Sequence, residues 1–420
     1  MGPVELVMVG AGNRGHLAYG AFALRNPEVA RFVAVVEPDD ARRARFAEAH
    51  QIAADRQFRS WEEIASRAPL APALINATLE RTHRASTLAL LATGYDILLE
   101  KPMATTAAEC LEIANAAEAA GKLLQIAHVL RYAPFFVAIR DLIRSGRLGE
   151  IVSVDWRENL VFWHFAHSYI RGNWGNTGRA GPMILTKCCH DLDLLVWIFG
   201  RCERLSSSGS LTHFTRDAVG PDIPDRCTDG CPIEDSCPYF APRVYLDRLR
   251  ENPASFTVSA ITLERTPAGV MRALETGPYG RCVYRADNDA VDHQVVLMQF
   301  AGGLSVSLTM QGSSHVEGRT VRIDGRRATL LANESRGEIE IHDHRTGEVE
   351  RMTRQRGVGG HGGGDDGLIR AFTDAIRGDR EGVLTSAREA VASHLMAFAA
   401  ERARERHQVV DMVAFAREIA

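Results

Sequence analysis

The chain has 420 residues, of which 24% are charged and 45% hydrophobic, and its formal net charge is -4 at pH 7. This composition is that of a globular protein with room for two domains, and it excludes a fibrous or disordered chain. The charges are spread out and no basic block alternates with aromatic residues, so we expect no nucleic-acid partner. No long apolar run and no signal-peptide pattern occurs, so we expect a cytoplasmic enzyme with no membrane partner.

A dinucleotide-binding motif lies near the start of the chain. An apolar run at 5–9 is followed directly by Gly10-Ala11-Gly12-Asn13-Arg14-Gly15 and then by a helical pattern at 16–24. A strand, these glycines and a helix in that order are the context of a dinucleotide site. The glycines permit a tight turn and close approach of a pyrophosphate, and the helix N-terminus faces its negative charge.

The next apolar run, 32–36, ends in Glu37. This is the position of the acid that binds the ribose hydroxyls in such folds. A carboxylate repels a 2′-phosphate, so the sequence favours NAD over NADP. Arg42 and Arg43 could soften that preference, but we interpret them as exposed positions of a helix at 40–50.

Helices and strands alternate through the first third of the chain. The pattern predicts helices at 60–64, 82–93 and 106–120, and strands at 73–78, 95–99 and 123–127. Repeated strand–helix units with short connections predict a parallel sheet with helices on both faces. We therefore expect a nucleotide-binding domain over 1–128.

The pattern changes after residue 129, and we assign 129–420 to a second domain for substrate binding and oligomerisation. Strand follows strand here without intervening helices, which predicts a largely antiparallel sheet. We expect strands at 150–158, 255–263, 291–300, 304–310, 320–323, 328–331 and 338–342, and helices at 134–145, 185–198, 366–377 and 385–406, with 366–420 forming the C-terminal helices. The glycine-rich patch 357–364, which contains His361, is either a connector or a mobile element beside the site, and we favour the connector.

Lysine is rare in this chain. Lys101, Lys122 and Lys187 are the three lysines, and the other 46 of the 49 basic residues are arginines. A lysine kept in such a chain suggests a need for a compact ammonium that can give up a proton. Lys101 precedes a proline, which holds it extended at the carboxyl end of a strand, where open α/β sheets bind ligands. We therefore place Lys101 in the site, the alternative being a surface lysine.

Five motifs together resemble the Gfo/Idh/MocA family, which is named for glucose–fructose oxidoreductase and inositol dehydrogenase. They are the fingerprint 10–15, Thr78 followed by His83, Glu100-Lys101-Pro102, Arg131-Tyr132-x-Pro134 and His190-x-x-Asp193. The resemblance implies an α/β protein with an N-terminal Rossmann domain and a C-terminal α/β domain that has an open, largely antiparallel sheet. It also implies NAD(P)-linked chemistry on a sugar, cyclitol or glycoside, and a homo-oligomer, dimer or tetramer, formed through the open sheet.

The resemblance also suggests which residues form the site. In such proteins the lysine of Glu-Lys-Pro and a histidine on the first long helix of the second domain flank the reacting carbon, which here implies Lys101 and His190. A base takes the hydroxyl proton and a cation stabilises the alkoxide. The alternative for His190 is a core histidine. Cofactor contacts are expected from Gly10, Gly12, Asn13, Arg14, Gly15, Glu37, Thr78, His83, Glu100 and Lys101, and substrate contacts from Arg131, Tyr132, His128, His164, Trp174 and Asp191.

One position departs from the inositol dehydrogenase pattern. That pattern has an aspartate four residues before the histidine, where this chain has Thr186. Threonine cannot hold an imidazole as a carboxylate does, so either the proton relay or the substrate must differ. Lys187 follows directly and shares a helical face with His190 and Asp191, so we predict that it is an acid/base or substrate residue. The alternative is an ordinary helix lysine.

Residues 202–250 resemble an insertion that carries a cysteine cluster. Cys227, Cys231 and Cys237 lie within eleven loop-like residues, a grouping that favours structural zinc over a disulfide in a cytosolic protein. Cys202, His213 and Cys282 are candidates for a fourth ligand. Free thiols, an iron–sulfur centre and a disulfide stay open as alternatives.

Three functions are compatible with these residues. The leading one is an NAD-dependent dehydrogenase acting on a sugar, cyclitol or glycoside hydroxyl. The second is an NAD-dependent glycosidase, which oxidises the sugar transiently, eliminates the aglycone, adds water and re-reduces the sugar with no net NADH. It needs a further acid/base group, for which His128, Tyr132, His164 and Lys187 are candidates. A catalytically silent NAD-binding regulator is disfavoured because Lys101 and His190 are both present.

Overall fold

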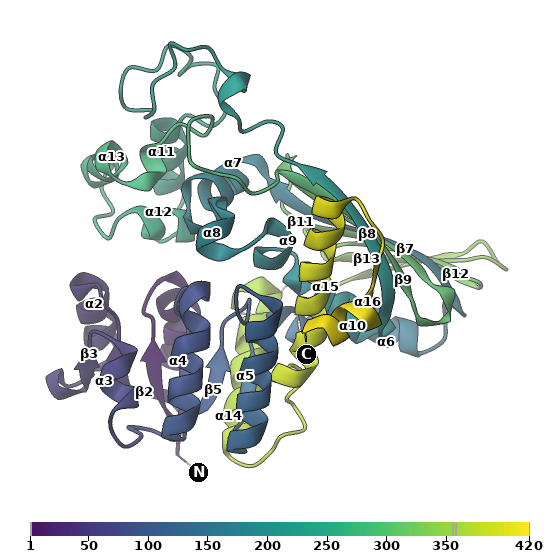
Figure 1. Ribbon diagram of the computed structural model, residues 1–420, viewed down its shortest axis with the longest axis horizontal. Helices are drawn as coiled ribbons and strands as arrows, with labels where there is room; N and C mark the ends of the chain where they lie inside the picture. Colours follow the sequence, from purple (N-terminus) through teal and green to yellow (C-terminus); the bar gives the residue numbers. More distant parts are fainter. Residues whose placement is uncertain (1, 355–356, 358, 420) are drawn as a thin grey trace.

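A computed structural model describes residues 2–354, 357 and 359–419 and contains two sheets, each with its own helices (Figure 1). The first sheet is wholly parallel, in the order β3-β2-β1-β4-β5-β6. Its strands are β1 Val4–Val9, β2 Ala30–Val36, β3 Gln57–Phe58, β4 Ala73–Asn76, β5 Asp96–Leu99 and β6 Leu124–Ile126, and its helices are η1 Arg14–Gly20, α1 Ala21–Arg25, α2 Asp40–His50, α3 Trp61–Ala65, α4 Glu80–Thr93 and α5 Ala107–Ala120. The predicted parallel α/β domain is confirmed.

Local sequence signals set the ends of these helices. Thr106 caps α5, because its hydroxyl accepts a hydrogen bond from the Glu109 main-chain nitrogen while the Glu109 carboxylate accepts one from the Thr106 nitrogen. Gly121, with a φ of 62°, ends the same helix in the left-handed region. The helices carry the chain back, so that all strands of this sheet run in the same direction. The carboxyl ends of β1, β4 and β5 therefore lie together at one edge.

The second sheet has nine strands in the order β14-β13-β12-β11-β7-β10-β9-β8-β15. Every neighbouring pair is antiparallel except β10 and β7, so the predicted, largely antiparallel sheet is confirmed. The strands are β7 Ile151–Val161, β8 Cys202–Ser210, β9 His293–Phe300, β10 Ser305–Ser314, β11 Gly318–Gly325, β12 Ala328–Asn333, β13 Glu338–Asp343, β14 Val349–Thr353 and β15 Val410–Asp411. Because β8 belongs to this sheet, residues 202–210 are not part of an insertion as we had expected.

The inserted segment runs instead between β8 and β9 and carries three helices, α11 Ala241–Glu251, α12 Phe256–Ile261 and α13 Pro267–Thr276. The strand predicted at 255–263 is wrong. Ser255 caps a helix there through its hydroxyl, and Val258 of that helix is fully buried with Tyr245 and Leu274. An alternating pattern over a segment as short as 255–263 does not distinguish a strand from a short amphipathic helix, and packing within the insertion decides for the helix.

The predicted helix 185–198 is also divided. The structure has α9 Met183–Thr186 and α10 Cys189–Phe199, with Lys187 and Cys188 at the break between them. Lys187 therefore does not continue the face of α10 on which His190 and Asp191 lie.

The remaining helices lie around the second sheet and between the two domains. They are α6 Pro134–Arg144, α7 Phe162–Phe165, α8 Thr177–Ala180, α14 Gly364–Ile376, α15 Ala387–Arg406 and α16 Met412–Ile419, with short turns of helix at η3 Val129–Tyr132, η4 Ala166–Arg171 and η5 Asn173–Gly175. In Figure 1 the insertion lies above the carboxyl edge of the first sheet. No helix in the described part of the chain is long and apolar enough to cross a membrane.

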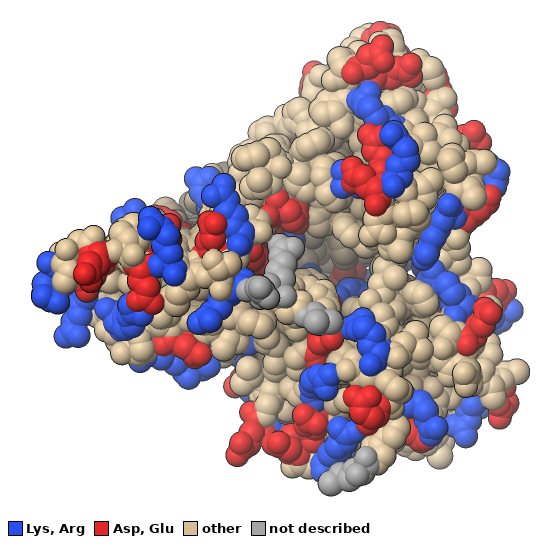
Figure 2. Space-filling model, turned by 180° about the vertical axis from the view of Figure 1, so that it is seen from behind, with Lys and Arg blue, Asp and Glu red and all other residues tan. Residues whose placement is uncertain are grey.

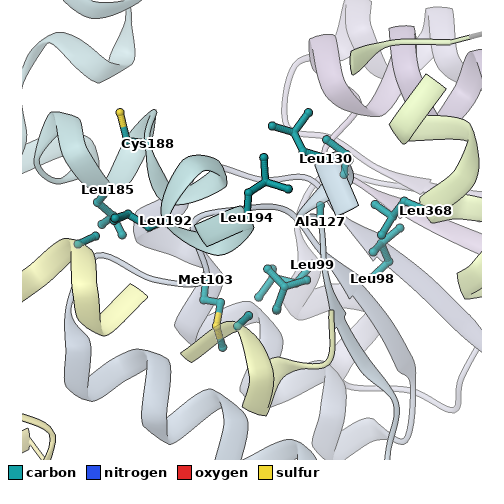
Figure 3. Close-up of a cluster of buried hydrophobic side chains, with 14 of the residues drawn as sticks. Leu98, Leu99, Met103, Ala127, Leu130, Leu185, Cys188, Leu192, Leu194 and Leu368 are labelled. Atoms are coloured by element: carbon teal, nitrogen blue, oxygen red, sulfur yellow. The ribbon is translucent and has the colours of Figure 1, made fainter. Parts of the chain in front are cut away.

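One buried apolar cluster joins the two domains beneath this edge (Figure 3). Leu98 and Leu99 come from β5, Leu185 from α9, Leu194 from α10 and Leu368 from α14, and each is 0% exposed. Close packing of this kind tolerates little displacement. The end of β5 and the start of α10 are therefore held in a fixed relation.

Candidate active site

Lys101 lies at the carboxyl end of β5, where the sequence places it, and reaches across to the second domain. Its Nζ donates a hydrogen bond to the carbonyl oxygen of Thr186 at 2.9 Å. Thr186 is the last residue of α9, and the final carbonyls of a helix have no partner within it. The broken helix thus supplies an acceptor that orients the Lys101 ammonium.

His190 lies in the first turn of α10 and is 4% exposed. Burial, and next the positive charge of Lys101, hold the pKa of His190 well below its ordinary value. The imidazole is therefore neutral near pH 7, and its Nδ1 has no hydrogen-bond partner among the described residues. The Thr186 hydroxyl contacts the Met183 carbonyl of its own helix at 3.5 Å, so it does not replace the aspartate of the inositol dehydrogenase pattern.

Four histidines form a row through the site. The ring centroids of His128 and His190 are 5.8 Å apart, those of His190 and His361 5.7 Å, and those of His128 and His394 5.4 Å. His394 on α15 was missed, because a histidine in the middle of a helical pattern carries no signal of what it packs against. Its Nε2 accepts a hydrogen bond from the Met103 main-chain nitrogen at 2.9 Å, which ties α15 to the loop that contains Lys101.

Lys187 lies in a buried cluster of charged side chains that contains two carboxylates. Its Nζ is 3.0 Å from Glu158 Oε1 and 3.8 Å from Glu317 Oε1, and Glu317 also pairs with His164 Nδ1 at 2.9 Å. Burial tends to lower the pKa of Lys187, but Glu158 and its other neighbours outweigh burial and raise it. Burial raises the pKa of Glu158 to about 7. These carboxylates favour the charged form of Lys187, and the expectation that it is an acid/base or substrate residue stays a prediction.

Three residues expected at the substrate have their polar groups committed to other protein groups. Arg131 makes two hydrogen bonds of 2.7 Å to the buried Asp193, and the Tyr132 hydroxyl accepts one from the main chain at 2.8 Å. Asp191 accepts hydrogen bonds from Arg319 at 2.7 and 3.2 Å. Motif position identified these residues in the sequence. Their partners lie far away in the chain, so the sequence did not indicate these contacts.

Trp174 links the two domains at the edge of the site. Its Nε1 donates a hydrogen bond to the Glu80 carboxylate at the start of α4, and Asn173 donates a second one at 3.2 Å. The Trp174 ring stacks on Tyr169 with a centroid distance of 5.5 Å. Trp174 therefore connects η5 of the second domain to the start of α4 in the first domain.

The fingerprint glycines form a cradle that fits a dinucleotide. Gly10 has a φ of 92°, and a Cβ there would lie 2.6 Å from the Ala77 oxygen. A Cβ on Gly15 would lie 2.1 Å from the Gly10 oxygen, whereas a Cβ on Gly12 would meet nothing within 4 Å. Space is therefore open beside Gly12, at the start of the helix, where a pyrophosphate would approach the main chain.

Glu37 is buried at the end of β2. Its carboxylate accepts hydrogen bonds from the main-chain nitrogens of Ala11 at 2.7 Å and Asp39 at 3.1 Å, so it is fixed next to the cradle. Arg43 donates to the Glu37 carbonyl at 2.7 Å and pairs with Asp40. The acid fits the ribose-binding position, and the guanidinium of Arg43 is engaged within the protein.

Other fingerprint and loop side chains hold the cradle in place. Arg14 pairs with Glu100 at 2.5 Å and with Asp365 at 3.0 Å, so it connects β5 to α14. The His83 ring lies between the carbonyls of Thr78 and Pro102, at 3.1 and 2.8 Å. The Asn13 amide donates to the Phe256 carbonyl of the insertion at 3.0 Å, which brings the insertion over the cradle.

The zinc prediction for Cys227, Cys231 and Cys237 is not supported. All eight cysteines are free, and nowhere in the described ranges do three or more His, Cys, Asp or Glu side chains form a group placed to hold a metal. The insertion is held together by its own apolar cluster and by main-chain hydrogen bonds, such as Cys227 N to Gly280 O at 2.9 Å and Cys282 N to Asp225 O at 2.8 Å. The apolar cluster therefore stabilises the insertion, which is the role that we had assigned to a metal.

Comparisons with known proteins agree with this geometry. The chain is 27% identical to the oxidoreductase YteT of Bacillus subtilis over 70% of each protein. It is 28% identical to an inositol 2-dehydrogenase of Acidothermus cellulolyticus over 37% of this chain and 42% of that protein. It is 34% identical to the trans-1,2-dihydrobenzene-1,2-diol dehydrogenase of Macaca fascicularis over 42% of this chain and 51% of that protein.

Solved structures share the fold over nearly the whole chain. Levoglucosan dehydrogenase in complex with NADH and levoglucosan superposes with a TM-score of 0.71 at 16% identity, covering 98% of this chain and 99% of that one. An oxidoreductase from Agrobacterium radiobacter, in complex with NAD+, L-tartaric acid and magnesium, gives 0.70 at 14% identity over 98% and 99%. The comparisons give no support to the glycosidase alternative.

Two family models match consecutive parts of the chain. One describes the NAD-binding Rossmann fold of an oxidoreductase family and matches residues 4–128, and the other describes the C-terminal α/β domain of that family and matches residues 140–412. The chain therefore belongs to the Gfo/Idh/MocA family of oxidoreductases.

Proposed function

We propose that this oxidoreductase oxidises a hydroxyl group of a sugar, cyclitol or glycoside in an NAD-dependent reaction. The observation that carries the proposal is that the Lys101 ammonium, held by the Thr186 carbonyl at the carboxyl edge of the first sheet, lies close enough to the neutral, buried His190 for its charge to lower the His190 pKa. The names of the inositol, diol and levoglucosan dehydrogenases support the same substrate class.

The two residues divide the chemistry between them. His190 accepts the hydroxyl proton, since its uncharged ring has a free lone pair. Lys101 stabilises the negative charge that develops on the oxygen as the carbonyl forms, and Thr186 keeps its ammonium in position. Bound NAD supplies the acceptor for the hydride that leaves the carbon. The cradle at Gly12 and the fixed carboxylate of Glu37 would hold its pyrophosphate and ribose.

Lys187, His164 and Glu317 form a polar wall that we assign to substrate binding. Their side chains are 14%, 18% and 41% exposed, so they are partly open to a ligand while they pair with one another. A cation, an imidazole and a carboxylate together can bind several hydroxyl groups of a polyol. Arg131 and Asp191 belong to the supporting framework in this proposal.

The test is turnover with NAD on two panels, free sugars and cyclitols that include inositol and levoglucosan, and aryl glycosides that release a coloured phenol. We expect NADH in proportion to a polyol substrate and no phenol. Lys101→Met should lower kcat/KM by about 10³-fold or more, because it removes both the charge and its hydrogen bond. Lys122→Met removes a lysine that lies outside the proposed site and serves as the matched control.

The site assignment fails if Lys101→Met keeps wild-type kcat/KM. NADH affinity should change no more than a few-fold in either variant, which separates lost chemistry from lost cofactor binding. Phenol release without NADH formation would refute the dehydrogenase hypothesis and would support the glycosidase hypothesis.

We further propose that the open face of the second sheet pairs with a second copy of the chain. Leu297 and Val295 of β9 are 56% and 37% exposed on this face. Figure 2 shows the molecule turned by 180° from the view of Figure 1. Acidic and basic residues are interspersed over this side, with no continuous patch of one sign. Sedimentation of the wild type and of Leu297→Glu tests the proposal, which predicts dissociation of the variant to a monomer.

A further inference from the structure

A second pocket lies outside the proposed active site, between α2 of the first domain and the loop that joins α12 and α13 of the insertion (Figure 1). Its volume is about 550 Å³, which is within the range of small-molecule sites. The residues that line it are His16, Arg45, Glu48, Ala49, Leu263 and Arg265. Gly10, Gly12 and Glu37 are not among them, so this pocket is separate from the dinucleotide cradle.

Two arginines from different parts of the chain meet at this pocket. Arg45 belongs to α2 and Arg265 to the insertion, and neither forms an ion pair with a described residue. The Glu48 carboxylate lines the same pocket, but it is exposed and pairs with neither of them. Burial, and next the positive charges of Arg265 and Arg42, lower the pKa of Arg45, while Asp39 opposes them. The two guanidinium groups therefore repel each other across the boundary between domain and insertion.

The pocket also contains buried nitrogen atoms without a hydrogen-bond partner. They are Arg45 Nε and His16 Nδ1, for which the described part of the chain provides none. Burial, and next the charges of Arg45 and Arg265, lower the pKa of His16 to about 4, so its imidazole is neutral near pH 7. A neutral imidazole still carries one N–H donor. The pocket thus combines unbalanced positive charge with unpaired donors, which is the chemistry of an oxyanion site.

We propose that this pocket binds a phosphate monoester, at a site separate from the cofactor and the substrate. Arg45 and Arg265 bind the phosphate oxygens, because a guanidinium group matches two such oxygens with parallel hydrogen bonds. His16 donates a further hydrogen bond from its ring. A phosphate ester carries a charge of about -1.5 to -2 at pH 7, so it balances both guanidinium groups, which a single carboxylate does not. Leu263 and Ala49 line the rest of the pocket and contact the carbon atoms of the ester.

The bound phosphate connects the insertion to the first domain. One anion between Arg45 and Arg265 replaces their mutual repulsion with attraction to both. The insertion also contacts the first domain through the Asn13 amide, which donates to the Phe256 carbonyl at 3.0 Å. The phosphate is therefore a second link between the same two parts of the protein. A ligand that binds only the folded protein raises its unfolding temperature.

The test is calorimetric titration of the NADH-saturated protein with inorganic phosphate and with phenyl phosphate, at constant ionic strength. NADH occupies the cradle, so phosphate bound there does not contribute. Phenyl phosphate has no hydroxyl group on carbon that could be oxidised, so its binding does not depend on the proposed dehydrogenase activity. We expect both anions to bind, and phenyl phosphate to bind more tightly because its ring contacts the apolar wall. Arg265→Gln should weaken both by about 10-fold or more, since it removes charge-assisted hydrogen bonds.

Arg216→Gln is the matched control. Arg216 is an exposed arginine of the same insertion, in the short helical turn η6 Arg216–Ala218, and it does not line the pocket. This variant loses the same charge as Arg265→Gln, so the two proteins have equal net charge. Its affinity for phosphate should equal that of the wild type.

A charge reversal provides a second, independent measurement. Arg265→Glu places a carboxylate beside Arg45, so attraction replaces repulsion without any ligand. In a chloride buffer this variant should unfold at a higher temperature than the wild type. Phosphate should raise the unfolding temperature of the wild type and leave that of Arg265→Glu unchanged.

Four results would overturn the inference. They are equal phosphate affinity in the wild type and Arg265→Gln, equal weakening in Arg216→Gln, a lower unfolding temperature of Arg265→Glu in chloride, and loss of phosphate binding on saturation with NADH. The last result would place the anion in the cofactor site. If inorganic phosphate binds at the pocket and phenyl phosphate does not, the anion site is supported and its assignment to an ester is wrong.

Discussion

Asp365 connects the last third of the chain to the dinucleotide cradle, and its removal is the sharpest test of how the two domains are held together. The side chain is 3% exposed and makes two 3.0 Å hydrogen bonds to Arg14, which is 32% exposed. Asp365→Asn keeps the size of the side chain and removes its charge. Arg14 then keeps Glu100 as its only anionic partner among those described.

The expected cost follows from this geometry. Removing one partner of a fully buried ion pair destabilises a protein by about 3–5 kcal/mol. Arg14 is partly exposed and retains Glu100, so solvent and the second carboxylate reduce that cost. We expect Asp365→Asn to lower the free energy of unfolding by about 2–3 kcal/mol.

Asp366→Asn is a matched control in the same turn of α14. It removes the same charge from the same helix N-terminus, so the two variants lose a similar interaction with the helix dipole. Asp366 pairs with Arg25 at 2.8 Å, but Arg25 is 42% exposed, and such surface pairs contribute at most about 1 kcal/mol. Urea unfolding of the three proteins measures the difference, and equal loss in both variants would refute the reasoning.

The pH dependence gives an independent check. The pKa of Asp365 in the folded protein lies below its ordinary value of 3.8. Its stabilisation is therefore present above pH 3.8 and is lost as the pH falls through the lower, folded value. The stability difference between wild type and Asp365→Asn should thus shrink as the pH falls below about 3.8, because protonation then removes the charge that the variant already lacks. A difference that did not shrink below this pH would contradict the assignment.

Further predictions concern the cradle, the link between domains and the buried charge cluster. Gly12→Ala should unfold at the wild-type temperature, because its Cβ meets no protein atom within 4 Å. It should nevertheless lose NADH affinity in a binding titration, because the Cβ occupies the space proposed for the pyrophosphate. Gly15→Ala should lower the unfolding temperature, since its Cβ would lie 2.1 Å from a main-chain oxygen of the same loop. Trp174→Phe removes one of the two hydrogen bonds that Glu80 accepts, while Asn173 keeps the other, and should cost about 1–3 kcal/mol in urea unfolding, whereas an unchanged midpoint would contradict that contact. The pKa of Glu158 is raised from 4.5 to about 7 in the folded protein, so its ionisation opposes folding. The wild type should therefore lose stability relative to Glu158→Gln as the pH rises from about 4.5 to 7, by up to about 3 kcal/mol, and a flat difference would refute the shift.

Much of the first domain could be predicted because its signals are local. The order of strand, glycines and helix, the acid after the second strand and the proline after Lys101 each act within a few residues. The second sheet was predicted in outline for the same reason. The helix α12, Phe256–Ile261, was missed, because its apolar residues pack on α11 and α13 rather than on the sheet.

The candidate site was predicted unevenly. Lys101 reaches the Thr186 carbonyl next to α10 and its charge lowers the pKa of His190, whereas Arg131 and Asp191 are bound to partners that are 62 and 128 residues away in the chain. Motif position could not distinguish a residue that contacts a ligand from one that holds the framework. His361 was noticed only as part of a glycine-rich patch, and nothing in its neighbourhood in the sequence indicated Arg14 as a distant anchor.

The sequence by itself determined the parallel domain, the dinucleotide cradle and the place of Lys101 after β5, because glycine, proline and hydrophobic periodicity act on the backbone over short distances. Only the tertiary structure decided which charges meet. It placed Lys187 against Glu158, divided the helix before His190, replaced the expected metal with an apolar core, and set His361 beside His190 through Asp365 and Arg14. Coulomb interactions and desolvation depend on distances in space that the order of residues does not contain, and these interactions set the protonation states on which the proposed chemistry depends.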